Sequence, residues 1–244
     1  MVAPRAGSGE GIGAGPCSAC HIDDLVLCSA LAEDERPRLA AIVNEVRADS
    51  GQTIFFEGDP ARHVFNVTEG AVKLYKLMAD GRRQITGFLF RGDFLGVALN
   101  TSYAYTAEAL TAARLCRFDR TAIEKLLNEF PRIERRLLEM AGNELVAAQD
   151  QMLLLGRKTA LERIVSLLIL LADRAERRGE PASPVNLPMT RSDIADYLGL
   201  TTETVSRAFT ELRKDGLIVL DRPDTVRLVR GEALDAIASG EGGG

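Results

Sequence analysis

The sequence predicts an α+β fold in which a sheet-rich N-terminal half is followed by one long helix and a helical C-terminal part. Three observations carry this prediction. Short apolar runs between residues 51 and 118 are separated by turn residues at intervals of about 8–12 residues, as in antiparallel sandwiches and barrels. A heptad of apolar residues follows residue 131, and after Thr190 a glycine separates two short helical segments. The 244 residues are enough for two domains, each with its own core.

The composition excludes several classes of protein. A net charge of −5 places any nucleic-acid contact on a local basic patch rather than on the whole surface. The chain has no Trp and only 5% aromatic residues, which argues against a stacking platform for single strands. The longest apolar run, Ile164–Ala172, is interrupted by Ser166 and is too short to span a bilayer. Residues 1–16 contain one Arg and no apolar core, unlike a secretory signal, so we expect a cytoplasmic protein without a membrane partner.

The N-terminal region combines a low-complexity tail with a cluster of cysteines. Residues 1–16 are rich in Gly, Ala and Pro, which predicts disorder. Cys17, Cys20 and Cys28 lie within twelve residues of one another. Four cysteines in a reducing compartment are poor candidates for structural disulfides, so this clustering indicates a metal or cluster site. Residues Asp34–Val46 have apolar side chains at helical spacing and predict one short helix.

Six apolar runs predict the strands of the sheet-rich half. They are Thr53–Phe56, His63–Thr68, Ala71–Met78, Gln84–Phe90, Phe94–Leu99 and Ala107–Phe118. The first four are each followed by a turn sequence, namely EGDP, EG, ADG and RGD. This pattern predicts an antiparallel sandwich or barrel.

Two helices are predicted after the sheet. Asp119 is placed to cap a helix that runs to Phe130, and Pro131 begins a second helix at the turn where proline is tolerated. The second helix, which runs to about Leu155, carries a heptad with Leu138, Leu145 and Met152 at one seam position and Ala141, Ala148 and Leu155 at the other. Three heptads of this kind predict a two-stranded coiled coil and hence a homodimer. The alternative is a helix packed on its own sheet.

The C-terminal part begins at a hinge-like Gly156-Arg157-Lys158 and continues with an amphipathic helix over Thr159–Arg178. A loop rich in Pro and Ser follows, with a strand-like segment at Val185–Leu187. Leu217–Leu220 and Thr225–Val229, separated by a DRPD turn, predict a small hairpin or wing.

Between the loop and the wing, the residues predict a helix-turn-helix. Thr190 and Asp193 have the spacing of a capping box, and the helix Arg191–Leu198 ends at Gly199, where a left-handed residue is needed. Thr201 or Thr202 then caps a second helix over Glu203–Asp215, which Gly216 stops. In this motif the second helix enters the major groove of DNA. The alternative is a helical hairpin with surface charges.

The second helix presents a candidate reading face. Glu203, Ser206 and Arg207 fall at i, i+3 and i+4, opposite the apolar face formed by Val205, Phe209 and Leu212. Arg can donate two hydrogen bonds to guanine, and Glu can accept one from the amino group of cytosine. The residues suited to phosphate contacts are Arg191, Ser192, Arg213 and Lys214. Thr202, at the start of the second helix, is a further candidate for a DNA contact.

The chain resembles the FNR/CRP family of bacterial regulators in three stretches. These are LGLTTETVSR in the helix-turn-helix, GRRQITGFLFRGDFLG over Gly81–Gly96, and LLLGRKTALER over Leu153–Arg163. The resemblance implies a cysteine loop and antiparallel β-roll over residues 17–130, a dimerisation helix over 131–156 and a winged helix-turn-helix over 157–244. It also implies double-stranded DNA as a partner and RNA polymerase near the Gly81–Gly96 segment.

Within that family, the expected signal is not a cyclic nucleotide. Nucleotide binders of the family are expected to carry a Glu after the glycine of their phosphate cassette and an Arg-Ser or Arg-Thr pair further on, because Arg forks onto phosphate. Here Val97 stands at the position of the Glu, and Tyr105-Thr106 replaces the pair. The segment between Arg91 and Arg114 contains no other Arg.

The cysteines resemble those of the oxygen-responsive FNR-type members. That resemblance implies a [4Fe–4S] cluster held by Cys17, Cys20, Cys28 and Cys116, a full set of four thiolates. Zinc, thiol redox control or constitutive activity are the alternatives, and Cys116 on its own, which shares a strand face with Phe118, reads as a plain buried thiol. His21 could replace a cysteine ligand, although a solvent-facing loop residue is the simpler interpretation.

The sequence therefore predicts a non-enzymatic transcription regulator, expected to activate at low oxygen from a two-fold symmetric site resembling TTGAT…ATCAA. An iron–sulfur enzyme or electron carrier is disfavoured because no cofactor-binding loop or catalytic dyad accompanies the cysteines. Ala148 occupies a seam position where some FNR-type proteins carry an acidic residue that opposes dimerisation. Its presence disfavours a switch that works purely by exchange between monomer and dimer.

Overall fold

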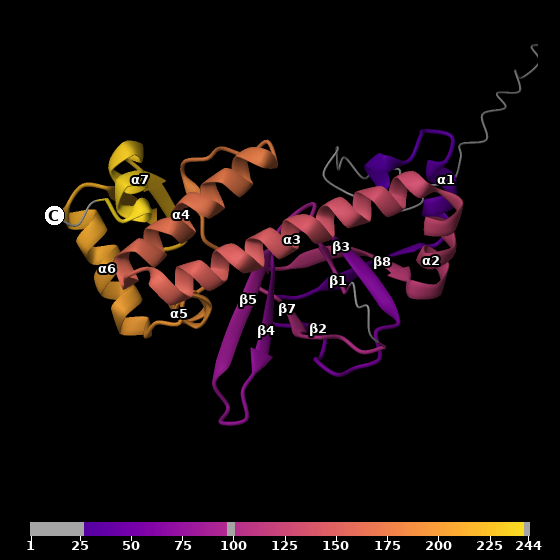
Figure 1. Ribbon diagram of the computed structural model, residues 1–244, viewed down its shortest axis with the longest axis horizontal. Coiled ribbons are helices and arrows are strands. Elements are labelled where there is room, and N and C mark those ends of the chain that lie inside the picture. Colours follow the sequence, from indigo (N-terminus) through magenta and orange to yellow (C-terminus); the bar gives the residue numbers. More distant parts are fainter. Residues whose placement is uncertain (1–26, 97–100, 242–244) are drawn as a thin grey trace, which may run out of the picture.

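The computed structural model describes residues 27–96 and 101–241, drawn in colour in Figure 1. The expected disordered tail (residues 1–16), Cys17, Cys20 and Val97 lie outside the described residues. A sheet domain, one long helix and a helical C-terminal domain follow in chain order, as the sequence predicts. In the described part of the chain, no helix is long and apolar enough to cross a membrane.

The sheet domain consists of two antiparallel four-stranded sheets packed face to face. The first has the order β1 (Val43–Ala48), β8 (Ala113–Asp119), β3 (His63–Glu69), β6 (Phe94–Leu95). The second has the order β2 (Thr53–Phe55), β7 (Thr106–Ala109), β4 (Val72–Leu77), β5 (Arg83–Leu89). Strand side chains from both sheets, among them Phe55, Phe65, Val67, Leu74, Leu89 and Leu115, form a buried core between them. The predicted antiparallel β-roll is therefore confirmed.

The prediction of one helix over Asp34–Val46 is wrong for the second half of that segment. Only Arg36–Ala40 is helical (α1), preceded by a short 3-10 helix η1 (Leu27–Ala30), and the chain then enters strand β1. Val43 pairs with Phe118 and Val46 with Leu115 of β8. The apolar spacing of this segment fits both structures, and pairing with a strand some 70 residues later in the chain decides between them.

The two helices after the sheet have the predicted starts. Asp119 accepts a hydrogen bond from Ala122 N at 3.1 Å and caps α2 (Arg120–Glu129), and Pro131 begins α3 (Pro131–Arg157). The predicted hinge lies slightly later than expected, because Gly156 and Arg157 are still helical and Lys158 is the first extended residue. Figure 1 shows α3 running along the sheet domain, from the end that carries α1 and α2 to the C-terminal domain.

The C-terminal domain is a helical core flanked by a three-stranded sheet. It contains α4 (Ala160–Arg177), β9 (Val185–Asn186), α5 (Arg191–Leu198), α6 (Thr202–Lys214), β10 (Ile218–Arg222), β11 (Thr225–Leu228) and α7 (Gly231–Ser239). The strands follow the order β10-β11-β9, so the predicted wing gains a third strand from the loop before α5. Helix α7, which the sequence pattern does not predict, packs on α4 through the buried Leu234.

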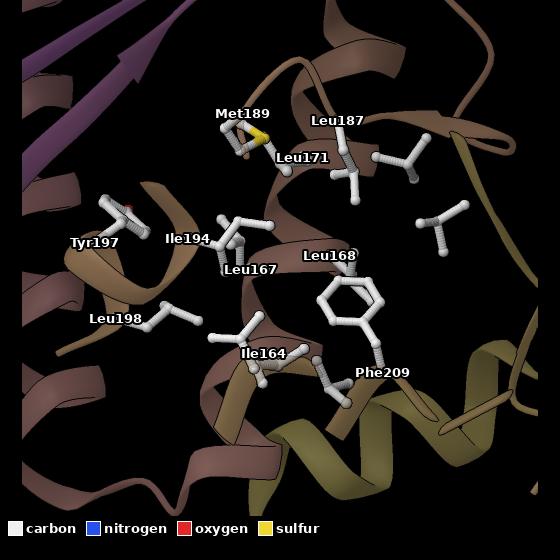
Figure 2. Packing of buried hydrophobic residues seen from close by; sticks show 14 of the residues in the cluster. Ile164, Leu167, Leu168, Leu171, Leu187, Met189, Ile194, Tyr197, Leu198 and Phe209 are labelled. Atoms are coloured by element: carbon white, nitrogen blue, oxygen red, sulfur yellow. The ribbon is translucent and has the colours of Figure 1, made fainter. Parts of the chain in front are cut away.

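Apolar residues of α4 form the centre of this domain (Figure 2). Leu167 and Leu168 are almost fully buried between Ile194 of α5 and Phe209 of α6. The same buried cluster continues into the sheet domain, where it includes Ala71, Tyr75, Ile85, Phe88 and Phe90. The helix-turn-helix is thus packed both on α4 and on the second sheet of its own chain.

Candidate nucleic-acid interface

The first helix of the helix-turn-helix has the predicted boundaries and caps. Thr190 Oγ1 accepts a hydrogen bond from Asp193 N at 3.1 Å, and Asp193 Oδ2 accepts one from Thr190 N at 3.0 Å. This reciprocal arrangement is the capping box that the sequence predicts. Gly199 ends the helix with φ +62°, in the left-handed region that a side chain with a Cβ disfavours.

The second helix begins one residue earlier than predicted. Thr201 is its cap, because Thr201 Oγ1 accepts a hydrogen bond from Thr204 N at 3.1 Å, and Thr202 is the first helical residue. The helix ends at Lys214, one residue before the predicted end, and Gly216 follows with φ +69°. Thr202 is exposed at the N-terminus of the helix, where free backbone N–H groups favour an anion such as a DNA phosphate.

The two faces of α6 are those that the sequence predicts. Val205 and Leu212 are fully buried, and Phe209 is nearly so. On the opposite face, Glu203 and Arg207 are exposed and form an ion pair with 2.5 Å between Arg207 Nη2 and Glu203 Oε1. Ser206 lies on the same face and donates a hydrogen bond to Thr202 O at 2.9 Å. This face is open to solvent and carries donors and acceptors that can reach base edges.

The candidate phosphate-binding residues differ in accessibility. Ser192 at the start of α5 and Arg213 and Lys214 at the end of α6 are exposed. Arg191 is half-buried, because its guanidinium lies over the ring of Phe209 at 3.4 Å from the centroid, and burial lowers its pKa. Arg191 therefore helps to hold α5 against α6, in addition to its position beside the candidate reading helix.

The wing carries further cations, which are not among the residues predicted from the sequence. Arg222, Arg227 and Arg230 are exposed on or next to the β10–β11 hairpin. Arg227 is bound by Asp221 through two short contacts of 2.7 Å, which neutralise part of its charge. The sequence does contain an indication of these residues, because three arginines lie within nine positions at the predicted hairpin and just after it.

Two of the four candidate cluster ligands lie in the described residues. Cys28 in η1 and Cys116 in β8 belong to one apolar cluster, in which Cys116 is 7% exposed and Phe118 is on the same strand face, as predicted. The two cysteines are far apart in the sequence and are brought together by the fold. No group of three or more potential ligand side chains in residues 27–96 and 101–241 could hold a metal, so a site with four thiolates requires Cys17 and Cys20.

The predicted seam of α3 is largely open to solvent. Leu138, Leu145 and Met152 are 67%, 60% and 69% exposed, and Ala141 and Ala148 are exposed as well. All ten residues from 141 to 150 are exposed. Leu155, the sixth seam residue, differs because it is half-buried against the core of the C-terminal domain, beside Gly199.

Comparison with known proteins gives matches along most of the chain. Residues 45–130 match the model of the cyclic nucleotide-binding domain, and residues 162–237 match that of the Crp-like helix-turn-helix domain. The chain is 40% identical to the transcriptional activatory protein AadR of Rhodopseudomonas palustris, over 90% of this chain and 92% of AadR. It is 42% identical to the nitrogen fixation regulation protein FixK of Bradyrhizobium diazoefficiens, over 84% of this chain and 86% of FixK.

The chain belongs to the CRP/FNR family. The solved structure of FixK2 from Bradyrhizobium japonicum has the same fold, with a TM-score of 0.76 and 37% identity over 80% of this chain and 97% of that one. As a member of the CRP/FNR family, the protein is a DNA-binding transcription regulator and not an enzyme. The predicted family and fold are confirmed.

Aromatic rings pack together in one part of the β-roll of this CRP/FNR-family chain. Tyr103 stacks on Phe55 with 3.8 Å between the ring centroids, and its hydroxyl donates a hydrogen bond to His63 O at 2.8 Å. The hydroxyl of Tyr105 accepts a hydrogen bond from Gly96 N at 3.1 Å. These rings occupy the segment where a nucleotide-binding member of the family is expected to present its phosphate-binding Arg.

Proposed function

We propose that this CRP/FNR-family regulator is an oxygen-responsive activator that binds DNA as a homodimer while a [4Fe–4S] cluster is held by Cys17, Cys20, Cys28 and Cys116. The observation that carries the proposal is the convergence of Cys28 and Cys116 in one apolar cluster. Thiolates are the usual ligands of such a cluster, and an apolar shell limits the access of solvent. When bound by these four cysteines, the cluster would supply sensitivity to oxygen, because oxidation of the iron–sulfur unit would dismantle it.

The residues around Cys28 contact the start of α3, and these contacts connect the proposed cluster to the proposed dimerisation helix. The apolar cluster that contains Cys28 and Cys116 also contains Ile133 and Leu137 from the start of α3. Just after Cys28 along the chain, Glu35 pairs with Arg132 of α3 at 2.6 Å and accepts a hydrogen bond from Ala32 N at 2.8 Å. A change in the cysteine segment therefore alters the packing at the N-terminal end of α3.

The exposed apolar seam of α3 is the proposed dimer interface. Leu138, Leu145, Met152 and the two alanines form a stripe at heptad spacing, which a second copy of the helix can cover. Ala148 introduces no charge into this stripe. A dimer with two-fold symmetry presents two α6 helices to two inverted half-sites, with Arg207 at guanine, Glu203 at the paired cytosine and Ser206 at the outer pairs.

The proposed contact with RNA polymerase is the hairpin between β4 and β5. It projects from the sheet domain in Figure 1, and its tip exposes Leu77 and Met78, at 62% and 49% of their surface. Apolar side chains exposed at a loop tip favour a protein partner. The stacked rings of Phe55 and Tyr103 and the absence of an Arg between Arg91 and Arg114 support a function without cyclic nucleotide.

The cofactor proposal is tested by anaerobic purification followed by analysis of iron, acid-labile sulfide and zinc. The expected result is a full [4Fe–4S] complement whose visible absorption is lost in air together with DNA binding. Replacing any one of the four cysteines by Ala abolishes cluster assembly, because each replacement removes a required ligand. His21→Ala is the matched control and keeps the cluster. Zinc in place of iron, or a full cluster in Cys116→Ala, would contradict the proposed ligand set.

A further inference from the structure

A buried lysine of the sheet domain binds the first helix of the helix-turn-helix. Lys73 of β4 is 8% exposed, and its Nζ lies 3.0 Å from Glu108 Oε1 of β7 and 3.0 Å from Asp193 Oδ1 of α5. The side chain of Asp193 is 4% exposed. Charges this deeply buried persist only when they are paired and hydrogen-bonded, so the contact between β4 and α5 is specific in position.

A second cation reinforces the same contact. Arg83 of β5 lies 2.9 Å from Asp193 Oδ1 and 2.8 Å from Asp196 Oδ2. Burial alone would raise the pKa of Asp193, but the hydrogen bonds from Thr190 and Lys73 outweigh it, and the net pKa lies below the ordinary value. The carboxylate is therefore charged at neutral pH and holds two cations of the sheet domain.

The contact beyond the other end of β5 has the reverse polarity. Here the cation, Arg174, belongs to α4 of the DNA-binding domain, and it lies 3.1 Å from Asp93 in the turn after β5. Arg174 also donates a hydrogen bond to Phe88 O at 2.9 Å. Between the two polar patches, the rings of Phe88 and Tyr197 pack with 5.0 Å between their centroids.

The charges of the two patches match each other in the observed orientation of the domains. Sheet cations meet helix anions on the α5 side, whereas a sheet anion meets a helix cation on the α4 side. A rotation or a slide of the helix-turn-helix by one helical turn separates the buried charges from their partners, which is costly in a low-dielectric interior. The reading face of α6 stays exposed while these contacts are formed, so this orientation is compatible with DNA binding.

We propose that Lys73, Arg83, Asp193, Asp196, Arg174 and Asp93 form an interdomain clamp that sets the angle of each helix-turn-helix and so selects the spacing between the two half-sites. This inference rests on the proposed function in one respect, namely the homodimer on inverted half-sites. The clamp residues are positioning residues, because they act on DNA through the orientation of α6. Without the clamp, the angle of each reading helix is fixed less tightly and the dimer accepts several spacings.

The test uses the anaerobically purified full-length protein and a set of duplexes. Each duplex carries two inverted half-sites. In one duplex they have the best spacing, and in the others one or two base pairs are inserted or removed between them. The clamp variants are Lys73→Met, which keeps the apolar stem, and Asp196→Asn, which changes a more exposed group at 28%. Lys76→Met is the matched control, since Lys76 is on the same strand but is exposed and pairs with Glu57 instead.

The expected result is a weaker preference for one spacing in the clamp variants. The ratio of affinities between the best and the altered spacings falls about tenfold in Lys73→Met and less in Asp196→Asn, whereas Lys76→Met keeps the wild-type ratio. Thermal unfolding shows whether each variant folds. If Lys73→Met does not fold, the spacing preference of Asp196→Asn decides whether the clamp exists. Folded clamp variants that bind all duplexes more weakly with an unchanged ratio overturn the clamp. A wild-type protein with no preference for spacing overturns the dimeric function and the clamp with it.

Discussion

Arg207 and Glu203 form an ion pair on the exposed face of α6, with 2.5 Å between Arg207 Nη2 and Glu203 Oε1. They are separated by one helical turn, and the side chains are 79% and 72% exposed. An exposed pair of this kind adds little to folding stability. The pair places the guanidinium donors of Arg207 beside the carboxylate acceptor of Glu203. The proposed reading of both bases of one G·C pair requires a donor and an acceptor side by side in this way.

The first prediction separates base reading from phosphate binding. Arg207→Ala removes a hydrogen-bonding fork from guanine and weakens specific binding by about 1–3 kcal/mol per half-site, with a relaxed preference at that base. Arg213→Ala, at the exposed end of α6, weakens binding to all sequences alike and reduces the salt slope by about 1 for each phosphate that the side chain neutralises. Titrations of specific and scrambled duplexes at several salt concentrations distinguish the two. An unchanged ratio in Arg207→Ala would show that the reading face is elsewhere.

The second prediction concerns the dimer. Because the α3 seam is apolar and Ala148 adds no charge, the protein without a cluster keeps appreciable dimer in air at micromolar concentration. Leu145→Glu places like charges opposite each other at the seam and gives a monomer. Glu139→Gln, on the same helix but outside the seam, is the control. Analytical ultracentrifugation measures all three, and a wild-type protein that is monomeric in air would restore simple exchange between monomer and dimer as the switch.

The third prediction concerns the connection between α3 and the helix-turn-helix. Arg163 donates hydrogen bonds to Leu155 O at 2.8 Å, Lys158 O at 2.9 Å and Leu198 O at 2.9 Å. It thereby satisfies carbonyl groups at the C-terminal ends of both α3 and α5. Arg163→Gln leaves some of these acceptors unpaired and lowers the free energy of unfolding by about 1–3 kcal/mol. Arg177→Gln, exposed near the end of the same helix, changes it by less than about 0.5 kcal/mol. Urea unfolding monitored by circular dichroism provides the measurement, and equal losses in the two variants would contradict this role.

Local chemistry explains which parts of the fold are predictable from the sequence. The capping box of Thr190 and Asp193 and the left-handed Gly199 depend on neighbouring residues only, and both are found as predicted. Strand β1 is missed because its apolar spacing also fits a helix, and the decision comes from pairing with β8. Leu155 continues the heptad of α3, but the fold turns its side chain into the core of the adjacent domain.

Contacts between domains are the part of the site that sequence reasoning misses. Lys73 and Asp193 are 120 residues apart, and each has a plausible local role, Lys73 as a strand residue and Asp193 as a capping residue. The local pattern accounts for Asp193 completely through Thr190, so nothing in it indicates a second function. The four-cysteine ligand set is different, because it comes from the resemblance to FNR-type regulators and stays a prediction; the described residues place Cys28 and Cys116 in one apolar cluster.

The last prediction is a loss of stability in mild acid that depends on His63. Burial in β3 and the positive charges of Arg117 and Arg62 lower the pKa of His63 below 6.5, and the attraction of Asp119 is too weak to reverse this. The unfolded chain therefore takes up a proton at a higher pH than the folded protein does. The contribution of His63 to stability is fully present above the unfolded pKa, and it is lost as the pH falls from about 6.5 toward the lower folded pKa.

Urea unfolding of the protein without a cluster between pH 7.5 and pH 5.5 should show this decline. It should be flattened in His63→Gln and retained in His21→Gln, the variant of the only other histidine. A decline that persists in His63→Gln and disappears in His21→Gln would assign the proton uptake to the N-terminal segment instead.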